Sequence, residues 1–205
     1  MVDEFVFLDD VPFSRGFRNR NLIKTGHGLK WMTIPLRDKT GTAIRELFTV
    51  DDSWRDTHWK QLVHSYNKTA HFKLYADYFE PLYKGSENNL SIINRQFIET
   101  INKILGITTP ISWSHEHTGI AGKNERLIEI CQSCGANTYL SGPAARDYVD
   151  ESLFGKNRIE VEWMDYNGYP EYTQMFPPFE HGVTILDLLF NEGPHSKKFM
   201  KSFLL

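Results

Sequence analysis

The spacing of apolar positions divides the chain into three segments of different character. Two apolar and aromatic runs near the N-terminus predict buried strands over residues 4–8 and 30–36, and the stretch between them, with Gly26 and Gly28, is predicted to be loop or turn. From residue 53 to residue 105 the apolar positions recur with helical spacing. The last third of the chain returns to short strands that alternate with helices.

The middle segment predicts three helices. The first begins at Ser53, and the second covers residues 70–83, where Pro81 bends or ends it. The third covers residues 89–105 and has Gly106 as its C-cap. Their apolar faces indicate that the three helices pack together and cover one face or end of the sheet.

The order of elements in the last third predicts the fold class. The expected strands are 110–114, 137–140 and 159–164. The expected helices are 123–135, a short one directly after Gly142, and 184–191, which Thr184 can cap. Because strand-helix-strand order places successive strands in parallel, we expect an α/β fold with a mainly parallel sheet flanked by helices. A length of 205 residues suits a single domain over 1–205, with the helices of 53–105 as an insertion.

Composition narrows the possible partners. The formal net charge is −3, from 23 basic and 26 acidic residues, so no strong positive field attracts nucleic acid. No apolar run has the length of a membrane span, and the residues after Met1 do not form a signal peptide. The expected protein is soluble and cytoplasmic.

The first predicted strand leads into a dense group of charged and amide side chains. Asp9 and Asp10 follow the strand, and further polar groups come between residues 18 and 24: Arg18, Asn19, Arg20, Asn21 and Lys24. Guanidinium groups bind phosphate or carboxylate in a bidentate way, so this set predicts an anion site. The alternative is an ion-pair network between the two carboxylates and the basic residues, but buried ion pairs stabilise weakly, which favours a site.

A second candidate site lies where a predicted strand turns into a helix. Tyr139 is followed closely by Ser141 and Gly142, so a hydroxyl and free backbone N–H groups lie at a helix N-terminus, where an anion is favoured. The alternative is a capped helix start, with Ser141 as the N-cap and no ligand.

Histidines and cysteines supply two weaker signals. His115 and His117 follow a predicted strand, so they could ligate a metal, but no third ligand follows at a recognisable spacing. Either His115 or His117 could instead act alone as a general base. Cys131 and Cys134 form a C-x-x-C pattern without a second pair, which favours two buried apolar groups over a redox pair or half of a zinc site.

Two further features combine polar and aromatic groups. Tyr172 and Gln174 belong to an aromatic and amide-rich loop, which fits either sugar recognition or a packed loop with satisfied tyrosines. Asp187 lies within the apolar helix of 184–191, where it could cap the helix, pair with the basic residues near the N-terminus, or face water.

Four phrases in this order resemble the WbqC-like protein family over about residues 3–193. They are Asp9-Asp10 with Arg18-Asn19-Arg20-Asn21-x-Ile23-Lys24-Thr25, Trp31-Met32-Thr33-Ile34-Pro35, Thr138-Tyr139-Leu140-Ser141-Gly142, and Ile185-Leu186-Asp187-Leu188-Leu189-Phe190-Asn191-Glu192-Gly193. The loop with Tyr172 and Gln174 is similar to the family's Pro-x-Tyr-x-Gln. One departure is that family members usually begin with a further strand of the His-Gln-Pro type, whereas this sequence begins at Met1-Val2-Asp3.

The resemblance implies an enzyme that makes precursors of bacterial surface polysaccharides of the O-antigen type. The substrate would be a nucleotide-linked aminosugar that receives an acyl or aminoacyl group from a thioester or nucleotide-activated donor, and no metal is expected. Asp9, Asp10 or His115 would take the proton of the attacking amine, and the Arg18–Lys24 set, Tyr139, Ser141, Gly142, Tyr172 and Gln174 would bind substrate. The alternatives are a noncatalytic ligand-binding or scaffold protein and a metal-dependent hydrolase that uses His115 and His117.

Overall fold

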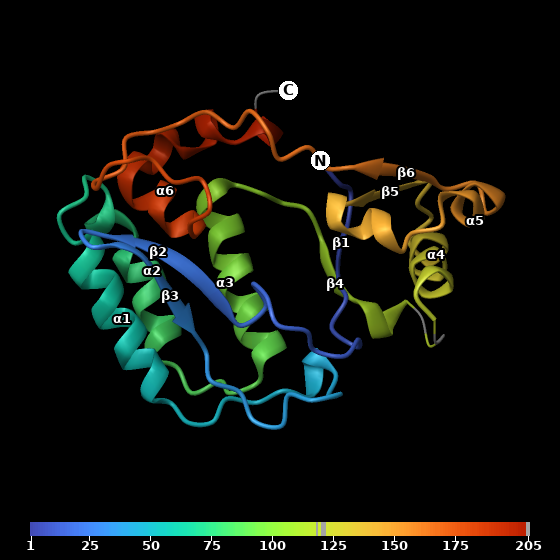
Figure 1. Cartoon of the computed structure of the whole chain (residues 1–205), viewed down its shortest axis with the longest axis horizontal. Helices are drawn as coiled ribbons and strands as arrows, with labels where there is room; N and C mark the ends of the chain where they lie inside the picture. The colour runs from blue at the N-terminus through green and yellow to red at the C-terminus, as the bar shows by residue number, and fades with distance from the viewer. Residues whose placement is uncertain (118, 120–121, 204–205) are drawn as a thin grey trace. The chain divides into compact units, whose positions relative to one another are not determined.

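The computed structural model describes residues 1–117, 119 and 122–203, which form two compact units (Figure 1). Unit 1 consists of Met1–Asp10 and Thr109–Gly168, and unit 2 consists of Val11–Thr108 and Tyr169–Leu205. The three predicted helices of 53–105 all belong to unit 2. The two units are described separately below.

Unit 1 is built on two pairs of parallel strands. Strand β1 (Phe5–Phe7) pairs with β4 (Ile111–Trp113), and β5 (Thr138–Ser141) pairs with β6 (Glu160–Trp163). All four agree with predicted strands: β1, β4 and β6 are each shorter by one residue at both ends, and β5 has the predicted length but lies one residue further along the chain. In the β1–β4 pair, Phe5 lies opposite Ile111, so the segment after β4 lies near the segment after β1.

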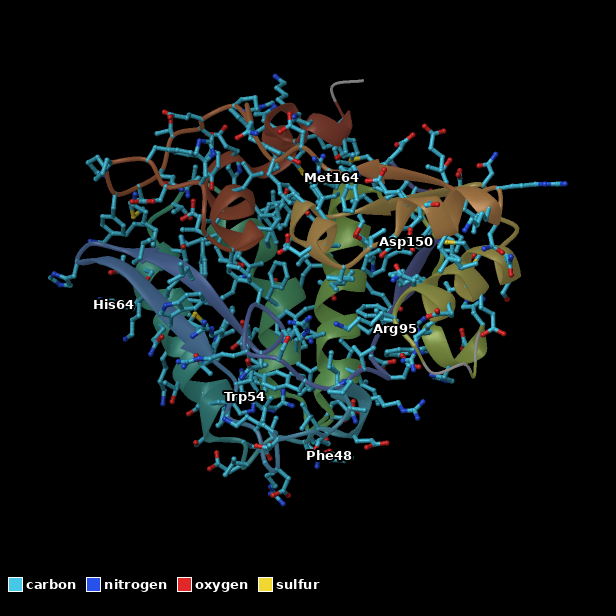
Figure 2. All side chains as sticks on the ribbon, turned by 45° about the vertical axis from the view of Figure 1, so that its right-hand side comes forward. Phe48, Trp54, His64, Arg95, Asp150 and Met164 are labelled. Atoms are coloured by element: carbon cyan, nitrogen blue, oxygen red, sulfur yellow. The ribbon has the colours of Figure 1, made fainter. Side chains whose placement is uncertain are left out.

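Two helices and a small apolar core complete unit 1. Helix α4 (Asn124–Ser133) and the short α5 (Glu151–Lys156) pack around Phe154, whose exposed fraction is 0%. Asp150, labelled in Figure 2, caps α5 because its side chain accepts a hydrogen bond from the N–H of Leu153. This core therefore lies within unit 1.

Unit 2 contains a β-hairpin that the sequence analysis missed in part. Strand β2 (Arg20–Thr25) pairs antiparallel with β3 (Gly28–Thr33) through a turn in which Gly28 has φ +103°. The prediction of loop between 4–8 and 30–36 is therefore wrong over Arg20–Thr25. Ile23 is the only large apolar side chain of β2 that is buried, at 1% exposed, so the strand lacks the apolar run that marked its neighbours.

The helices of unit 2 agree with the predicted periodicity. They are α1 (Ser53–Tyr66), α2 (Phe72–Lys84), α3 (Leu90–Leu105) and α6 (Ile185–Glu192). The prediction that Gly106 caps α3 is confirmed, since Gly106 is left-handed at φ +62°. Pro81 does not end α2, which continues to Lys84. Thr184 caps α6 as predicted, because its side chain accepts a hydrogen bond from the N–H of Leu186.

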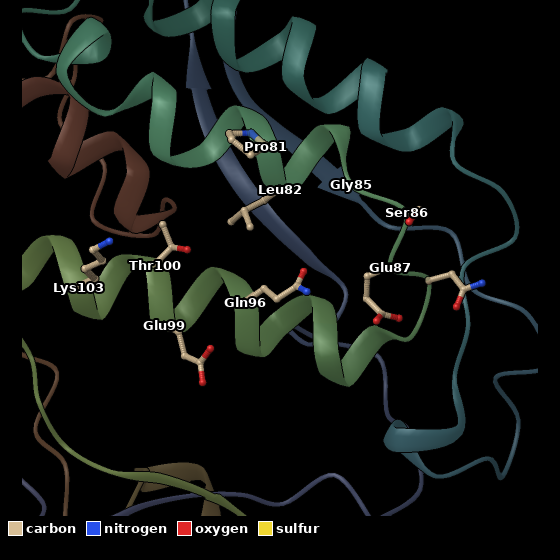
Figure 3. Close-up of a pocket in the computed structure, with 10 residues that line it drawn as sticks. Pro81, Leu82, Gly85, Ser86, Glu87, Gln96, Glu99, Thr100 and Lys103 are labelled. Atoms are coloured by element: carbon tan, nitrogen blue, oxygen red, sulfur yellow. The ribbon is translucent and has the colours of Figure 1, made fainter.

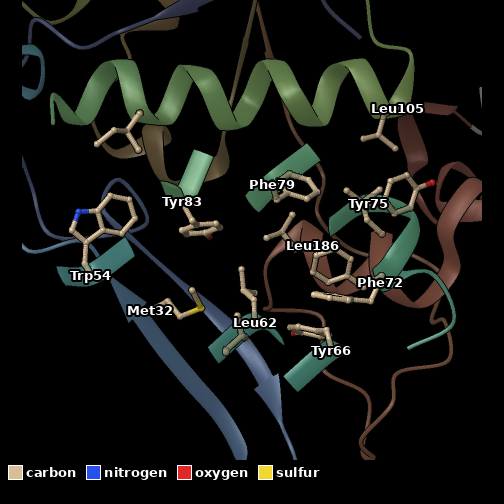
Figure 4. Packing of buried hydrophobic residues seen from close by; sticks show 14 residues of the cluster. Met32, Trp54, Leu62, Tyr66, Phe72, Tyr75, Phe79, Tyr83, Leu105 and Leu186 are labelled. Atoms are coloured by element: carbon tan, nitrogen blue, oxygen red, sulfur yellow. The ribbon is translucent and has the colours of Figure 1, made fainter. Parts of the chain in front are cut away.

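The core of unit 2 joins these helices to one face of the hairpin (Figure 4). Ile23 and Met32 of the hairpin pack against Leu62, Tyr66 and other side chains of the helices. The three helices pack together as predicted, and α1 contacts strand β2 of the hairpin. Short 3₁₀ helices fill the connections of both units: Ile44–Glu46, Ser114–Glu116, Pro143–Asp147, Gly193–Phe199 and Lys201–Phe203.

The predicted α/β class is confirmed by this mixture of helices and short strands. Over the described residues the strands form three two-stranded sheets, of which two are parallel and one is antiparallel. None of the helices in the described part of the chain is both long enough and apolar enough to cross a membrane.

Candidate functional site

Unit 1 contains a cavity of about 660 Å³ beside strands β1 and β5. One wall is the N-terminal segment from Met1 to Val6 together with Leu8, and the opposite wall comes from the end of α4 and from residues 135–140. Val6 and Leu8 contribute apolar surface, whereas Glu4, Cys134 and Tyr139 contribute groups that can form hydrogen bonds. The volume lies in the range of small-molecule sites.

Three titratable side chains meet at the edge of this cavity. His117 Nε2 lies 3.3 Å from Glu4 Oε1, and His117 Nδ1 lies 3.6 Å from Cys134 Sγ. The two remaining contacts of the ring are with serine hydroxyls: Nε2 lies 2.7 Å from Ser112 Oγ, and Nδ1 lies 3.2 Å from Ser133 Oγ. The imidazole therefore lies between a carboxylate and a thiol, both of which line the cavity.

The local fold explains why these three residues meet. Glu4 directly precedes β1, and the parallel pairing with β4 places Ser112 beside Val6 and near Glu4, whose carboxylate accepts a hydrogen bond from the Ser112 hydroxyl. His117 follows β4 after the 3₁₀ turn Ser114–Glu116. Cys134 is the C-cap residue of α4, so it projects at the end of that helix.

The electrostatics of the cluster oppose a free thiolate. Burial, together with a smaller effect of the neighbouring Glu4 carboxylate, raises the pKa of the Cys134 thiol to about 11. The hydrogen bond from Ser112 is the main cause that lowers the pKa of Glu4. Glu4 is thus the favoured anion of the pair, and the thiol keeps its proton as long as no cation lies nearby.

The two cysteines of the C-x-x-C pattern have different surroundings. Cys131 is 6% exposed and packs in the apolar core with Leu127, Ile128 and Phe154, as predicted for a small buried group. Cys134 is half-buried, lines the cavity and contacts His117. The prediction of two buried apolar groups therefore holds for Cys131 and is wrong for Cys134, because the helix ends there.

The predicted catalytic residues Asp9, Asp10 and His115 all belong to unit 1. Asp10 forms an ion pair of 3.0 Å with Arg126 and accepts a hydrogen bond of 2.8 Å from the Ser114 hydroxyl. Asp9 is buried, at 4% exposed. His115 is exposed and stacks on Trp113. Their catalytic role stays a prediction.

The predicted anion-binding residues near the N-terminus belong to unit 2. Asn19 is buried and donates to the backbone carbonyl of Ile34, so its amide has a structural partner. Arg20 lies 4.1 Å above the ring of Trp31, whereas Arg18 and Asn21 are exposed. Of this set, the side chains of Arg18, Arg20 and Asn21 lie on or near the surface, where a ligand could reach them.

Lys24 belongs instead to a buried network around Asp187. Its ammonium donates to Gln174 Oε1 at 3.2 Å and to the carbonyl of Pro178. Asp187, 1% exposed, accepts hydrogen bonds from Tyr66 at 2.9 Å and from Tyr172 at 2.8 Å. The Gln174 amide donates to the same carboxylate at 3.1 Å, so this amide links Lys24 to Asp187. Asp187 is therefore buried rather than facing water, and its link to the basic Lys24 is indirect, through Gln174.

The same network includes Tyr172 and Gln174, which were considered for sugar recognition. Both side chains are half-buried, and their polar atoms have partners inside unit 2. Burial raises the pKa of the Tyr172 hydroxyl, and the charge of Asp187 acts in the same direction. The arrangement fits the packed-loop alternative of the sequence analysis, and sugar recognition by these residues stays a prediction.

The turn after β5 departs from the expected cap. Gly142, not Ser141, is the N-cap of the 3₁₀ helix Pro143–Asp147, and it provides no capping side chain. Ser141 is 8% exposed at the end of β5, and Tyr139 stacks on Phe154. A Cβ atom at Gly142 would meet the Tyr166 hydroxyl at 3.3 Å, so the glycine permits a close contact there.

Sequence reasoning missed Glu4 and Arg126 and assigned Cys134 to the core. Glu4 and Cys134 lie 130 positions apart, so no motif spacing could join them. The one sequence feature that could have separated Cys134 from the core is that the C-x-x-C pattern lies close to the end of a predicted helix.

A second hollow, in unit 2, lies between the end of α2 and the face of α3 (Figure 3). Its volume is about 790 Å³, and Leu82, Glu87, Gln96 and Lys103 are among its lining residues. None of the residues predicted to form a site lines it.

Comparison with known proteins agrees with the resemblance seen in the sequence. The WbqC-like protein family matches residues 1–199. The chain is 42% identical over 204 residues to Uncharacterized protein Rv1507c of Mycobacterium tuberculosis, an alignment that covers 98% of this chain and 88% of that protein. No solved structure matches the chain. The chain belongs to the WbqC-like protein family.

Proposed function

We propose that this protein is an enzyme of bacterial surface-polysaccharide precursor synthesis, of the O-antigen type, that transfers an acyl or aminoacyl group to a nucleotide-linked aminosugar. Family membership supports the polysaccharide-related role. The observation that carries the catalytic part is the cavity of unit 1, which combines a volume of about 660 Å³ with apolar and hydrogen-bonding walls.

Transfer of an acyl group to an amine requires proton transfers in addition to the exchange of bonds. The amine nitrogen attacks the carbonyl carbon of a thioester, a C–N bond forms, and the C–S bond breaks. The proton of the amine passes to a base of the protein, and the departing thiolate takes up a proton. None of the three predicted bases is among the lining residues of the cavity. Of the three, His115 has an exposed ring, whereas Asp10 is held by Arg126 and Ser114, so we assign the base to His115.

Phosphate binding is a separate part of the proposal. Considered within unit 2 alone, Arg18 and Arg20 have guanidinium groups that suit a phosphate group. Lys24 does not take part, since its ammonium is occupied inside the buried network.

A product assay tests the proposal. The purified chain is incubated with nucleotide-linked aminosugars and either coenzyme A thioesters or ATP with amino acids, and mass spectrometry detects the acylated sugar. We expect His115→Ala to lower kcat by about 10²–10⁴-fold. His64→Ala, a change at another exposed histidine, is the control and should leave kcat unchanged.

Binding measurements separate the catalytic proposal from its noncatalytic alternative. A thermal shift with a nucleotide sugar that Arg20→Ala abolishes, in the absence of any product, would contradict catalysis and favour a ligand-binding protein. A ligand at about 100 times its Kd stabilises by roughly 2.7 kcal/mol, which such a shift can detect. Absence of both product and shift would contradict the proposal as a whole.

A further inference from the structure

The cluster of Glu4, His117 and Cys134 has the composition and geometry of a metal site. Each residue offers one donor atom, and these three atoms all lie within 4.8 Å of one another. Within the described part of the chain, no other set of three or more such ligands was found this close together. The residues come from three separate segments of unit 1, and each is half-buried.

The separations are close to those that a bound ion requires. A tetrahedral zinc ion with bonds of about 2.0–2.3 Å holds its ligand atoms roughly 3.3–3.8 Å apart. The distance of 3.3 Å from His117 Nε2 to Glu4 Oε1 lies in that range, and so does the distance of 3.6 Å from His117 Nδ1 to Cys134 Sγ, although these two contacts use different ring nitrogens. Because only one ring nitrogen would bind the ion, the separation that applies to the three donor atoms together is at most 4.8 Å, so side chains would move closer on metal binding.

The surroundings of His117 match the second shell of a metal-bound histidine. A ligating imidazole donates the N–H of its other nitrogen to an oxygen acceptor, which fixes the ring. Here a serine hydroxyl faces each nitrogen: Ser112 at Nε2 and Ser133 at Nδ1. Whichever nitrogen binds the ion, the other has an acceptor within 3.2 Å.

The charges of the cluster also favour a bound metal ion. A thiolate and a carboxylate side by side repel each other, and a divalent cation between them removes that repulsion. Among the described residues, the ion-pair partner found for Glu4 is His117, and no lysine or arginine forms an ion pair with it. The cluster thus offers two potential anions and an imidazole nitrogen, and over the described residues no lysine or arginine forms an ion pair with Glu4 in place of a metal.

We propose that Glu4, His117 and Cys134 bind one divalent transition-metal ion, zinc or an ion of similar preference, at the wall of the unit 1 cavity. Thiolate, imidazole and carboxylate are the ligand types that zinc takes, and three protein ligands leave a fourth position for water or a ligand. Glu4 and Cys134 both line the cavity, so the ion is reachable from it. This site replaces the metal pair of His115 and His117 and differs from the expectation of no metal; it does not depend on acyl transfer.

Metal stoichiometry tests the site directly. The full chain without a histidine tag is stripped with a chelator, incubated with zinc or cobalt(II), dialysed, and analysed by mass spectrometry of the metal. We expect about one ion per chain. Bound cobalt should show a thiolate-to-cobalt charge-transfer band, which reports the cysteine ligand independently of any enzymatic activity.

Matched variants identify the ligands. Cys134→Ser should abolish the charge-transfer band and weaken metal binding by more than about 100-fold, since second-shell changes alone cost about 10–100-fold. Glu4→Gln should weaken binding without removing the band. Cys131→Ser, at the other cysteine, and His115→Ala, at the neighbouring histidine, should leave both readouts unchanged.

Two results would overturn the proposal. One is a folded wild-type chain that retains no zinc or cobalt after dialysis, in which case the cluster is a hydrogen-bonded group only. The other is unchanged metal binding in a folded Cys134→Ser or Glu4→Gln variant, as judged by circular dichroism. If Cys134→Ser fails to fold, Glu4→Gln decides the matter by the same two readouts.

Discussion

Asp187 is a carboxyl group enclosed in the core of unit 2. It is 1% exposed, and Tyr66, Tyr172 and Gln174 donate hydrogen bonds to it. Burial raises its pKa above the ordinary value of 3.8, although these hydrogen bonds and the charge of Lys24 act in the opposite direction. The network therefore holds an acid whose protonated form is favoured by folding.

This raised pKa predicts how stability depends on pH. Between 3.8 and the raised folded value, the folded state binds more protons at Asp187 than the unfolded state, so its contribution to the free energy of unfolding falls as pH rises. Asp187→Asn removes the titrating group. Urea unfolding between about pH 4 and 7 should show the wild type losing stability relative to the variant as pH rises. A pH-independent difference would contradict this.

The buried imidazole of His58 predicts the opposite dependence of stability on pH. Its ring is 7% exposed, and burial lowers its pKa from 6.5 to about 4, with a smaller opposing effect from a hydrogen bond to the backbone of Thr33. The folded state thus disfavours protonation of His58. The free energy of unfolding therefore falls by on the order of 3 kcal/mol as the pH falls from 6.5 through about 4.

Denaturant titrations of His58→Gln measure this effect. The variant should lose less stability than the wild type on acidification across that window, whereas His64→Gln, at an exposed position, should behave as the wild type does. Equal acid sensitivity of wild type and His58→Gln would show that another group causes the loss.

At the scale of elements, the ends of the helices in unit 2 depend on particular side chains and glycines. Asn89 caps α3 by accepting hydrogen bonds from the N–H groups of Ser91 and Ile92, and its amide also donates to the carbonyl of Arg45. Gly193 ends α6 at φ +56° and lies against the ring of His71. The helix boundaries are thus linked to neighbouring elements.

Gly193 at the end of α6 is a position where a larger residue is expected to destabilise the protein. A Cβ atom there would overlap the His71 ring, and the positive φ is unfavourable for any other residue. Gly193→Ala should therefore lower the free energy of unfolding by roughly 2–4 kcal/mol. Gly182→Ala is the matched control, because no atom lies within 4 Å of its added Cβ, and it should change stability by less than about 0.5 kcal/mol. Urea unfolding compares the two, and similar losses would contradict the steric argument.

At the scale of the whole molecule, each apolar core lies within one unit. The cluster around Phe154 belongs to unit 1, and the cluster around Phe79 and Phe190 belongs to unit 2. Chain segments distant in sequence build each unit, since unit 1 joins the first ten residues to residues 109–168. Each unit can therefore lose its core packing separately.

Hydrogen exchange tests this separation. Phe154 and Phe79 are both 0% exposed, and replacing either by alanine should remove about 3–5 kcal/mol of stability. Because local opening follows cooperative units, Phe154→Ala should speed amide exchange within unit 1 and Phe79→Ala within unit 2. Faster exchange throughout the chain from either variant would show one cooperative unit.

The sequence by itself determined the helices and most strands. Helical spacing over 53–105 and the caps at Gly106 and Thr184 are local patterns, because a helix is formed by residues three and four positions apart. Strand β2 escaped prediction because only one face of its hairpin is buried against the core and its other residues are mostly polar. The family was also recognisable from its four phrases.

The tertiary structure alone decided which polar groups meet. Lys24 and Gln174 lie 150 positions apart, and Glu4 and Cys134 lie 130 apart, so no local pattern carries their contact. The same holds for Asp10, which pairs with Arg126 and was expected near the basic residues of 18–24. Long-range contacts follow from how strands and helices pack to bury apolar surface, and that packing, not the spacing of polar residues, brought Glu4, His117 and Cys134 together.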